Sequence, residues 1–321
     1  MTAGSDLTGV KGALLCAGLG TRLRPLTDER PKPMLPLCNA PLARYGFALL
    51  RGAGVRTIGV NLHYLGGLLR AEFAGEVVYS DEPEILGTGG ALVRLARAID
   101  LAGDDLIVHN GKVVLELDLA DVIARHRASG AVATMVVREA PDARAWGAID
   151  VGDDGRVRGL LGDGRTMFCG VHVLTPEFLR VLPEGVSDSV RDAYIPLVRA
   201  GAPVVAYVAR GHFSEHSTPE RYLAAHLALL GGARVSQATW PLAGIDPSAT
   251  VDAAAWVVAP SLVGAGARIE AGARVGPLAT IGAGAIVAAG ATVERAVVWD
   301  GAVATGDLRD AIVTRRSVVR L

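Results

Sequence analysis

The stretch that decides the fold of the first part of the chain spans residues 13–27 and reads ALLCAGLGTRLRPLT. Its apolar start predicts a strand over Ala13–Ala17, which ends at Gly18 and Gly20. Glycines after a strand let a ligand approach backbone N–H groups, which can bind phosphate oxygens. Two common phosphate motifs are excluded, because Leu23 replaces the third glycine of GxGxxG and no GxxxxGK[ST] occurs in the chain.

Outward from this stretch, short apolar runs alternate with amphipathic helical patterns from Val10 to about Leu230. A helix is expected over Pro41–Arg51, with proline at its first position and glycines after its end. Further strands are expected at Val55–Val60, Glu76–Tyr79, Asp105–His109, Ala131–Arg138 and Val204–Val208. This order predicts a Rossmann-like α/β domain with a mainly parallel mixed sheet over residues 10–235.

The last eighty residues follow a six-residue register. The aliphatic members are Ile245, Val251, Val257, Val263, Ile269, Val275, Ile281, Val287 and Val293, and a small residue precedes each following member by two positions. Such a pattern predicts a left-handed β-helix, whose interior takes the aliphatic side chain and whose corners take the small one. We assign residues 243–321 to this domain, with about three coils over Ile245–Val293. The register stops there, so Trp299 and Ala302–Leu321 are expected to form a final irregular coil or cap.

Composition excludes several classes of protein. The net charge of −1 gives no basic field for nucleic acid or an anionic membrane. Cys16, Cys38 and Cys169 form no CxxC pair, and Met1–Val10 shows neither a leader nor a spanning segment. A cytoplasmic protein that binds neither nucleic acid nor membrane is therefore expected.

The whole string from residue 17 to residue 36 resembles the signature of the sugar nucleotidyltransferase (nucleotide-sugar pyrophosphorylase) family, AGxGTRLxPLT followed by PKPMLP. Further landmarks in the family's order are LGTGGAL at 86–92, Asn110-Gly111, Trp146-Gly147, Phe168-Cys169-Gly170 and Ser217-Thr218-Pro219-Glu220. The stretches at 60–63 and 167–179 resemble mannose-1-phosphate guanylyltransferases and N-acetylmuramate-1-phosphate uridylyltransferases most. An appended β-helix fits the guanylyltransferase and heptose branches.

The resemblance implies one reaction, in which a sugar 1-phosphate attacks the α-phosphorus of a nucleoside triphosphate, giving an NDP-sugar and pyrophosphate. Arg22 and Lys32 would be the catalytic residues, Arg22 at the β- and γ-phosphates and Lys32 near the α-phosphate or the sugar phosphate. The nucleotide would be lined by Ala17, Gly18, Gly20, Thr21, Gly87, Thr88 and Gly89, and the sugar by Asn110, Gly147 and Gly170. For Gly87–Gly90, an ordinary helix entry is the alternative.

Glu82 stands where the family places a side chain that reads the base. A carboxylate accepts two hydrogen bonds and so matches the two adjacent donors of guanine, which favours a GDP-mannose-like product. A surface charge before Pro83 is the alternative.

Two positions depart from the family, which binds Mg²⁺ through aspartates of Asn-Gly-Asp and Trp-x-Asp-x-Gly-Thr-Pro motifs. Here the first aspartate is Lys112 and the second is Glu215. Lys112 is one of only three lysines among 32 basic residues, so a specific charge near the nucleotide is expected there. Mg²⁺ is expected from the family, but an ammonium group beside it would repel it, which leaves Glu215 as the remaining candidate metal ligand.

Residue patterns elsewhere in the chain bear on three other functions. His212, Glu215 and His216 match the H-x-x-E-H pattern of zinc peptidases, but that chemistry needs the pattern on one helix, and a strand and a helix start flank it here. A bifunctional acyltransferase lacks its histidine base, because His226 is the last histidine and precedes the β-helix. The remaining alternative is a catalytically impaired regulator that binds a nucleotide or NDP-sugar and pairs with an active paralogue. The β-helix itself is expected to support a homo-oligomer.

Overall fold

The computed structural model describes residues 7–321, which divide into two compact units. The first, here called the sheet unit, comprises the chain up to Gly18 together with Gly46–Phe213. The second, here called the β-helix unit, comprises Leu19–Tyr45 and Ser214–Leu321. The domain limits 10–235 and 243–321 follow the sequence pattern and stay a prediction.

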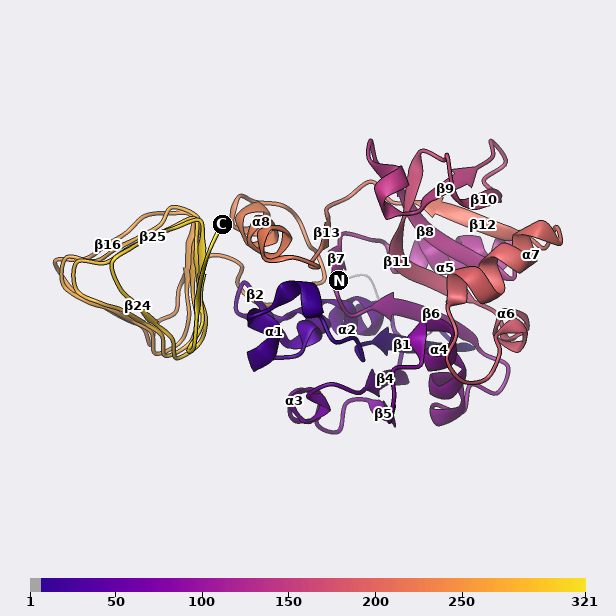
Figure 1. The fold of residues 1–321 in the computed structure, drawn as a ribbon, viewed down its shortest axis with the longest axis horizontal. Helices are drawn as coiled ribbons and strands as arrows, with labels where there is room; N and C mark the ends of the chain where they lie inside the picture. Colours follow the sequence, from indigo (N-terminus) through magenta and orange to yellow (C-terminus); the bar gives the residue numbers. More distant parts are fainter. Residues whose placement is uncertain (1–6) are drawn as a thin grey trace. The chain divides into compact units, whose positions relative to one another are not determined.

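Four parallel strands form the centre of the sheet unit, in the order β6-β1-β4-β5 (Figure 1). They are β1 Val10–Leu15, β4 Ile58–Leu62, β5 Val78–Asp81 and β6 Asp105–Asn110. Parallel strands end at the same edge of a sheet, and ligands of open α/β sheets bind outside those carboxyl ends. The residues that follow β1, β4, β5 and β6 are therefore the first place to look for a site.

Antiparallel strands extend the sheet beyond β6. β11 (Thr166–Leu174) runs antiparallel to both β6 and β8 (Ala133–Glu139), and β12 (Val204–Val208) lies parallel to β8. β9 (Ala148–Val151) and β10 (Val157–Gly162) form a hairpin beside β11. The predicted mixed, mainly parallel sheet is confirmed, and the β9–β10 hairpin is an addition. The sequence pattern does not predict this hairpin, because much of β10 is exposed and carries no apolar run.

Helices cover both faces of the parallel strands. A Cβ placed on Gly12 would lie 3.3 Å from Leu50 in α2 (Leu42–Gly52), whereas one on Gly59 would lie 2.9 Å from Leu95 in α4 (Gly87–Ala98). Gly59 pairs with Ala13, the neighbour of Gly12, and successive strand residues face opposite sides. Glycine at these two positions lets a helix approach each face closely.

The helices of the part of the chain that the structure describes are α1 Leu26–Glu29, α2 Leu42–Gly52, α3 Gly66–Glu72, α4 Gly87–Ala98, α5 Leu119–Ser129, α6 Pro176–Val181, α7 Ile195–Arg199 and α8 Pro219–Leu230. Short 3-10 turns lie at Thr21–Leu23, Lys32–Met34 and Ala143–Trp146, and a π turn lies at Val190–Tyr194. Short strands outside the main sheet are β2 Pro36–Leu37, β3 Ala40–Pro41, β7 Val113–Leu115 and β13 Phe213–Glu215. Over residues 7–321, no helix combines the length and apolar character that a membrane span needs.

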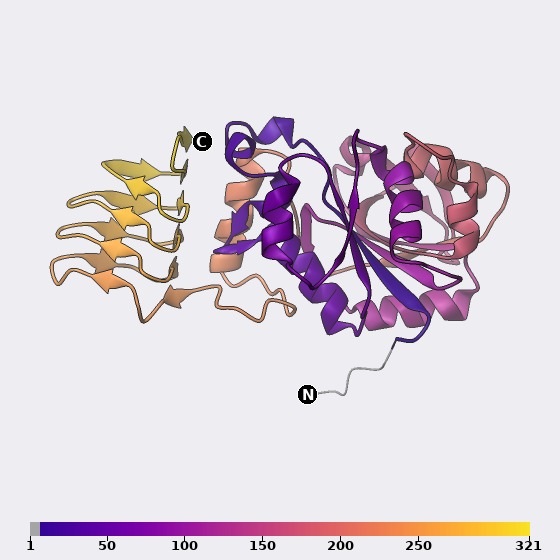
Figure 2. The ribbon, with the colours of Figure 1, turned by 90° about the horizontal axis from the view of Figure 1, so that it is seen from below.

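The β-helix has three faces of stacked short strands, which overlie one another as a triangle in Figure 1 and separate into coils in Figure 2. The first face contains β14 Gly244–Ile245, β17 Ser261–Val263, β20 Ala279–Ile281, β23 Val297–Val298, β26 Ala311–Val313 and β27 Val318–Arg320. The second contains β15 Thr250–Val251, β18 Arg268–Ile269, β21 Ile286–Val287 and β24 Val303–Ala304. The third contains β16 Trp256–Val257, β19 Arg274–Val275, β22 Thr292–Glu294 and β25 Asp307–Arg309. The predicted left-handed β-helix is confirmed.

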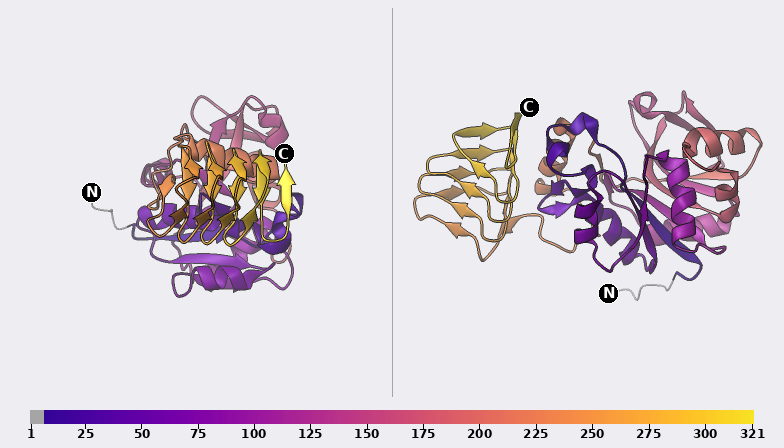
Figure 3. Two further views of the ribbon diagram at one scale, coloured as in Figure 1. Left: turned by 90° about the vertical axis from the view of Figure 1, so that its left-hand side faces the viewer. Right: turned by 60° about the horizontal axis from the view of Figure 1, so that its bottom comes forward.

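The interior of the β-helix follows the predicted register from Val263 to Val293, where every aliphatic member is buried. After Val293 the chain continues as the expected irregular coil, and not as a cap, as far as Val313. Ile269 pairs with Val287, eighteen residues on, but Val287 pairs with Ala304, seventeen on, and Val293 with Leu308, fifteen on. Because these coils are shorter than eighteen residues, their inward positions are no longer six residues apart. Each inward position still buries an apolar side chain. Figure 3 shows these coils continuing to the last strand, β27, which turns back antiparallel to β26.

Candidate functional site

The signature loop, defined here as residues 19–39, lies in the β-helix unit and is a series of tight turns. Gly20 has φ +66°, and a Cβ there would lie 2.9 Å from Cγ2 of Thr27. The Thr27 hydroxyl donates to the Gly20 carbonyl at 3.0 Å. A side chain at Gly20 would therefore strain the backbone and displace Thr27, so glycine is required here.

Thr21 and Arg22 follow in an exposed 3-10 turn. Within the described residues 7–321, no hydrogen bond or ion pair engages the Arg22 side chain. A guanidinium group is a planar fork of donors suited to phosphate oxygens. Arg22, the residue predicted to bind phosphate, is therefore exposed to solvent on this turn.

Lys32 is buried, and Glu215 holds it. The Lys32 Nζ lies 3.4 Å from Oε1 of Glu215, and Nη1 of Arg221 lies 3.4 Å from Oε2 of the same carboxylate. Arg221 also donates to the Ser217 hydroxyl at 2.9 Å. The Glu215 carboxylate is thus flanked by two cations, one from the signature loop and one from α8.

In the sheet unit, a hydrogen-bonded network joins the carboxyl ends of β1, β4 and β5. The Asn61 side chain accepts from the Cys16 backbone N–H at 2.6 Å and donates to Oε1 of Glu82 at 2.7 Å. Oε2 of Glu82 accepts from the Leu86 backbone N–H at 3.2 Å. Glu82 is buried, so the alternative interpretation of this residue as a surface charge is wrong. Its part in reading a base stays a prediction.

The Gly87–Gly89 segment, at the start of α4, packs against residues 185–189. A Cβ on Gly87 would lie 2.4 Å from the Ser187 carbonyl, and one on Gly89 would lie 2.5 Å from the Ser187 hydroxyl. The Thr88 hydroxyl accepts from the backbone N–H of Ser189 at 2.9 Å. Close packing therefore accounts for these glycines without a ligand, and their predicted contact with a nucleotide stays a prediction.

Two of the predicted sugar-binding residues lie together at the end of β6. Gly170 has φ +77°, and a Cβ there would lie 2.9 Å from the Asn110 amide nitrogen. Gly147 lies apart from them, at the end of a 3-10 turn, with φ +80°. Lys112 is half-buried, and its N–H donates to the Asn110 carbonyl at 2.7 Å. Ala17 is buried and Gly18 is exposed directly after β1, with nothing within 4 Å of a Cβ built on Gly18.

The donor set at the family's metal positions does not fit Mg²⁺. One position carries the ammonium group of Lys112, and the other carries Glu215, whose two oxygens face Lys32 and Arg221. Mg²⁺ requires several oxygen ligands in tight octahedral geometry, and nearby cations repel it. Among residues 7–321, no cluster of three His, Cys, Asp or Glu side chains could hold a metal ion.

The H-x-x-E-H pattern is not on a helix. Its middle residues form β13, and the following helix α8 begins only at Pro219, where Thr218 accepts from the Arg221 N–H as N-cap. The two histidines therefore do not share a helical face, and the peptidase interpretation is excluded on its own structural requirement.

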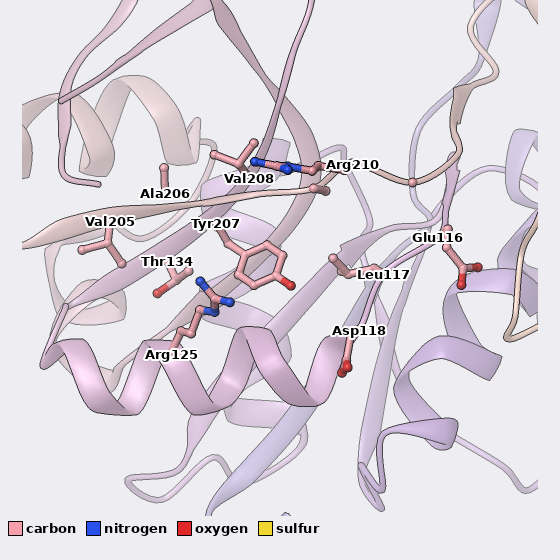
Figure 4. A pocket seen from close by; sticks show the side chains of 12 residues that line it. Glu116, Leu117, Asp118, Arg125, Thr134, Val205, Ala206, Tyr207, Val208 and Arg210 are labelled. Carbon is pink, nitrogen blue, oxygen red and sulfur yellow. The ribbon is translucent and has the colours of Figure 1, made fainter. Parts of the chain in front are cut away.

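A pocket of about 560 Å³ lies elsewhere in the sheet unit, between β12 and α5 (Figure 4). Its polar side chains include Arg125 and Tyr207, whose ring lies 5.3 Å from the guanidinium. Burial and the hydrogen bond to Asp121 raise the pKa of Tyr207 to about 12. None of the predicted site residues lines this pocket.

Sequence reasoning missed Arg221 and the Asn61–Glu82 bond. Arg221 carried no signal of its own, although its place three residues after the N-cap Thr218 sets it on the first turn of α8, near Glu215. The Asn61–Glu82 contact joins the ends of two neighbouring parallel strands, which only the strand order brings together.

Comparison with known proteins gives one family. Residues 11–161 match the model of the nucleotidyl transferase family. Relatives include a mannose-1-phosphate guanylyltransferase of Mycobacterium tuberculosis, 30% identical over 71% of this chain and 67% of its own length. A UTP–glucose-1-phosphate uridylyltransferase of Synechocystis is 28% identical over 61% of this chain and 57% of its own length. A mannose-1-phosphate guanylyltransferase catalytic subunit beta of Danio rerio is 26% identical over 67% of this chain and 63% of its own length. Together with the predicted motifs and fold, these matches show that the chain belongs to the sugar-1-phosphate nucleotidyltransferase family.

Proposed function

We propose that this protein is a sugar-1-phosphate nucleotidyltransferase that joins a nucleoside triphosphate to a sugar 1-phosphate. A phosphate oxygen of the sugar phosphate attacks the α-phosphorus of the nucleoside triphosphate. The bond between that phosphorus and the oxygen that bridges it to the β-phosphorus breaks, and pyrophosphate leaves. The observation that carries the proposal is the signature loop, which presents Arg22 exposed and unpaired among the described residues. The relatives, of which the chain covers 57–67%, are named as enzymes of this reaction type.

In this proposal the chain's own cations stabilise the transferring phosphates. Arg22 contacts the β- and γ-phosphates with its planar fork, and Lys32, held by Glu215, faces the α-phosphate or the sugar phosphate. Such catalysis depends on positioning and charge rather than on a covalent intermediate. Because the donor set does not fit Mg²⁺, Lys112 supplies a further positive charge beside the nucleotide.

A guanine nucleotide and a mannose-type sugar are the favoured substrates. Two of the relatives above are named as mannose-1-phosphate guanylyltransferases, and the Glu82 carboxylate retains lone pairs beyond those used by Asn61 and Leu86. A uridine nucleotide is the other candidate, because the Synechocystis relative is a uridylyltransferase. The comparisons give no support to the alternative of a regulator without activity.

Assembly and location complete the proposal. The Danio rerio relative is named as a subunit, which agrees with a homo-oligomer or with a hetero-oligomer containing a paralogue. All three cysteines are free and buried, as expected in the reducing cytoplasm.

A turnover assay tests the proposal. The full chain is incubated with GTP or UTP and with mannose 1-phosphate or glucose 1-phosphate, with and without Mg²⁺, and released pyrophosphate is measured. We expect release that requires both substrates, and a kcat/KM lowered roughly 10²- to 10³-fold by Arg22→Ala. Arg24→Ala removes an exposed arginine of the same loop that pairs with Asp28, and serves as the matched control. If no substrate pair releases pyrophosphate, the proposed activity is wrong.

A further inference from the structure

The β-helix contacts the signature loop through a continuous set of polar bonds within the β-helix unit. Nη2 of Arg30, in the loop, donates to both carboxylate oxygens of Asp300 at 2.7 Å, and the guanidinium lies 5.1 Å from the centre of the Trp299 ring. The two side chains of the pair are only 26% and 32% exposed, so water screens them partly. Next to this pair, the Thr314 hydroxyl bonds the Glu29 carboxylate.

A second group of contacts fixes the end of the loop. The Pro36 carbonyl accepts from both Tyr222 and His226 of α8, and Trp299 of the β-helix donates to the Tyr222 hydroxyl at 3.1 Å. The Asn39 amide donates to the Ile281 carbonyl at 3.0 Å. The segment between Glu29 and Asn39, which includes Lys32, is therefore bonded to the β-helix at both of its ends.

His226 has one protonation state that satisfies all of its neighbours. Its Nε2 lies 3.0 Å from the Pro36 carbonyl, which only accepts, so Nε2 carries the proton. Its Nδ1 then accepts from the Thr280 hydroxyl at 3.2 Å and from the Cys38 N–H at 3.4 Å. Burial, with a smaller effect of His216, lowers the pKa of His226 to about 3, so the ring is neutral. A neutral ring thus links β20, α8 and the loop.

We propose that Asp300 of the β-helix is a positioning residue that holds the signature loop, through Arg30, in the conformation from which Arg22 and Lys32 engage a nucleotide. The inference rests on the proposed function for its effect on binding, but the fixed loop itself is a property of the free protein. The β-helix then acts on the nucleotide site of its own chain and not only on assembly.

Four variants test this proposal. Arg30→Gln breaks the pair from the loop side and leaves the contact between Asp300 and Arg315 intact, whereas Asp300→Asn breaks it from the β-helix side. Asp310→Asn removes a similar pair with Arg295, at 2.8 Å, that does not involve the loop, and is the matched control.

Hydrogen exchange of residues 19–35 is measured in the free full chain, and GTP and UTP are titrated into each variant. We expect Arg30→Gln and Asp300→Asn to speed exchange in the loop by about tenfold and to weaken nucleotide binding several-fold, with the sheet unit unchanged. Asp300→Glu keeps the charge and is expected to retain most of the protection, and Asp310→Asn should match wild type.

Loop exchange in Arg30→Gln and Asp300→Asn equal to that in Asp310→Asn would overturn the positioning proposal. A wild-type protein that binds neither GTP nor UTP would instead overturn the proposed function, because the exchange comparison needs no nucleotide.

Discussion

Lys112 stands where the family has a metal-binding aspartate, and its effect is best argued from charge. An ammonium group is a compact point charge that can approach phosphate oxygens and replace part of the charge of one Mg²⁺. It cannot supply the ordered oxygen shell of the ion. Affinity for a nucleotide can therefore be kept without metal, while the metal dependence of the site changes.

We predict that nucleotide binding is largely independent of Mg²⁺ in wild type and becomes dependent on it in Lys112→Asp. The measurement is a calorimetric titration of GTP or UTP with either chelator or Mg²⁺ present. Restoring full metal use is expected to need Glu215→Asp as well, because Glu215 is engaged by Lys32 and Arg221. Equal affinities of wild type and Lys112→Ala in chelator would show that Lys112 does not replace the ion.

The sequence proposes candidate site residues, but it does not give their partners. Gly18, Gly20 and Arg22 belong to one contiguous motif, whose local turns are largely set by Gly20 and Thr27. In contrast, the ion pair between Lys32 and Glu215 joins residues 183 positions apart. Such a contact depends on the packed tertiary structure, and no local pattern encodes it.

Among the elements, the β-helix was the most predictable, although its six-residue register does not extend to the last coils. Burial of the aliphatic side chain at each inward position stabilises the fold by about 1.5–3 kcal/mol. The sequence therefore keeps an aliphatic residue at a regular spacing. After Val293 the coils shorten to seventeen and fifteen residues, and Ala304, Leu308 and Val313 still point inward and are buried. A constant spacing of six residues therefore does not identify the inward positions of these shorter coils.

Strand limits in the sheet unit were displaced for a related reason. The strand expected at Val55–Val60 is β4 at Ile58–Leu62, because Val55 is buried in the turn that precedes it. Burial of an apolar side chain does not distinguish a strand from its connecting loop. In contrast, β12 lies over the predicted residues, Val204–Val208.

The first coil of the β-helix leads to a prediction about assembly. Ile245 and Val251 are 49% and 36% exposed, unlike their counterparts Val263 and Ile269 in the next coil, and Trp256 beside them is 61% exposed. We predict self-association through the β-helix, so that truncation after Gly232 lowers the number of chains per particle found by light scattering. Because truncation also removes the bonds to the signature loop, Trp256→Glu in the full chain is the second variant. The same number of chains per particle in wild type and in both variants would leave the β-helix without that role.

The whole molecule combines the fold of its family with a different set of charged residues at the family's metal positions. The signature motif is complete from Gly18 to Pro36, whereas both aspartates expected to bind metal are replaced. A chain that had lost its function would be expected to lose nucleotide-site residues as well. The central claim is therefore that the signature loop binds a nucleotide through Arg22, with this chain's own cations in place of a metal ion.

Calorimetric titration of GTP and UTP into wild type, Arg22→Ala and Arg24→Ala, all in chelator, tests this claim most directly. We predict measurable binding to wild type, an affinity at least about tenfold weaker in Arg22→Ala because a charge-assisted contact is lost, and little change in Arg24→Ala. Binding of equal strength to wild type and Arg22→Ala, or no binding of either nucleotide to wild type, would contradict it.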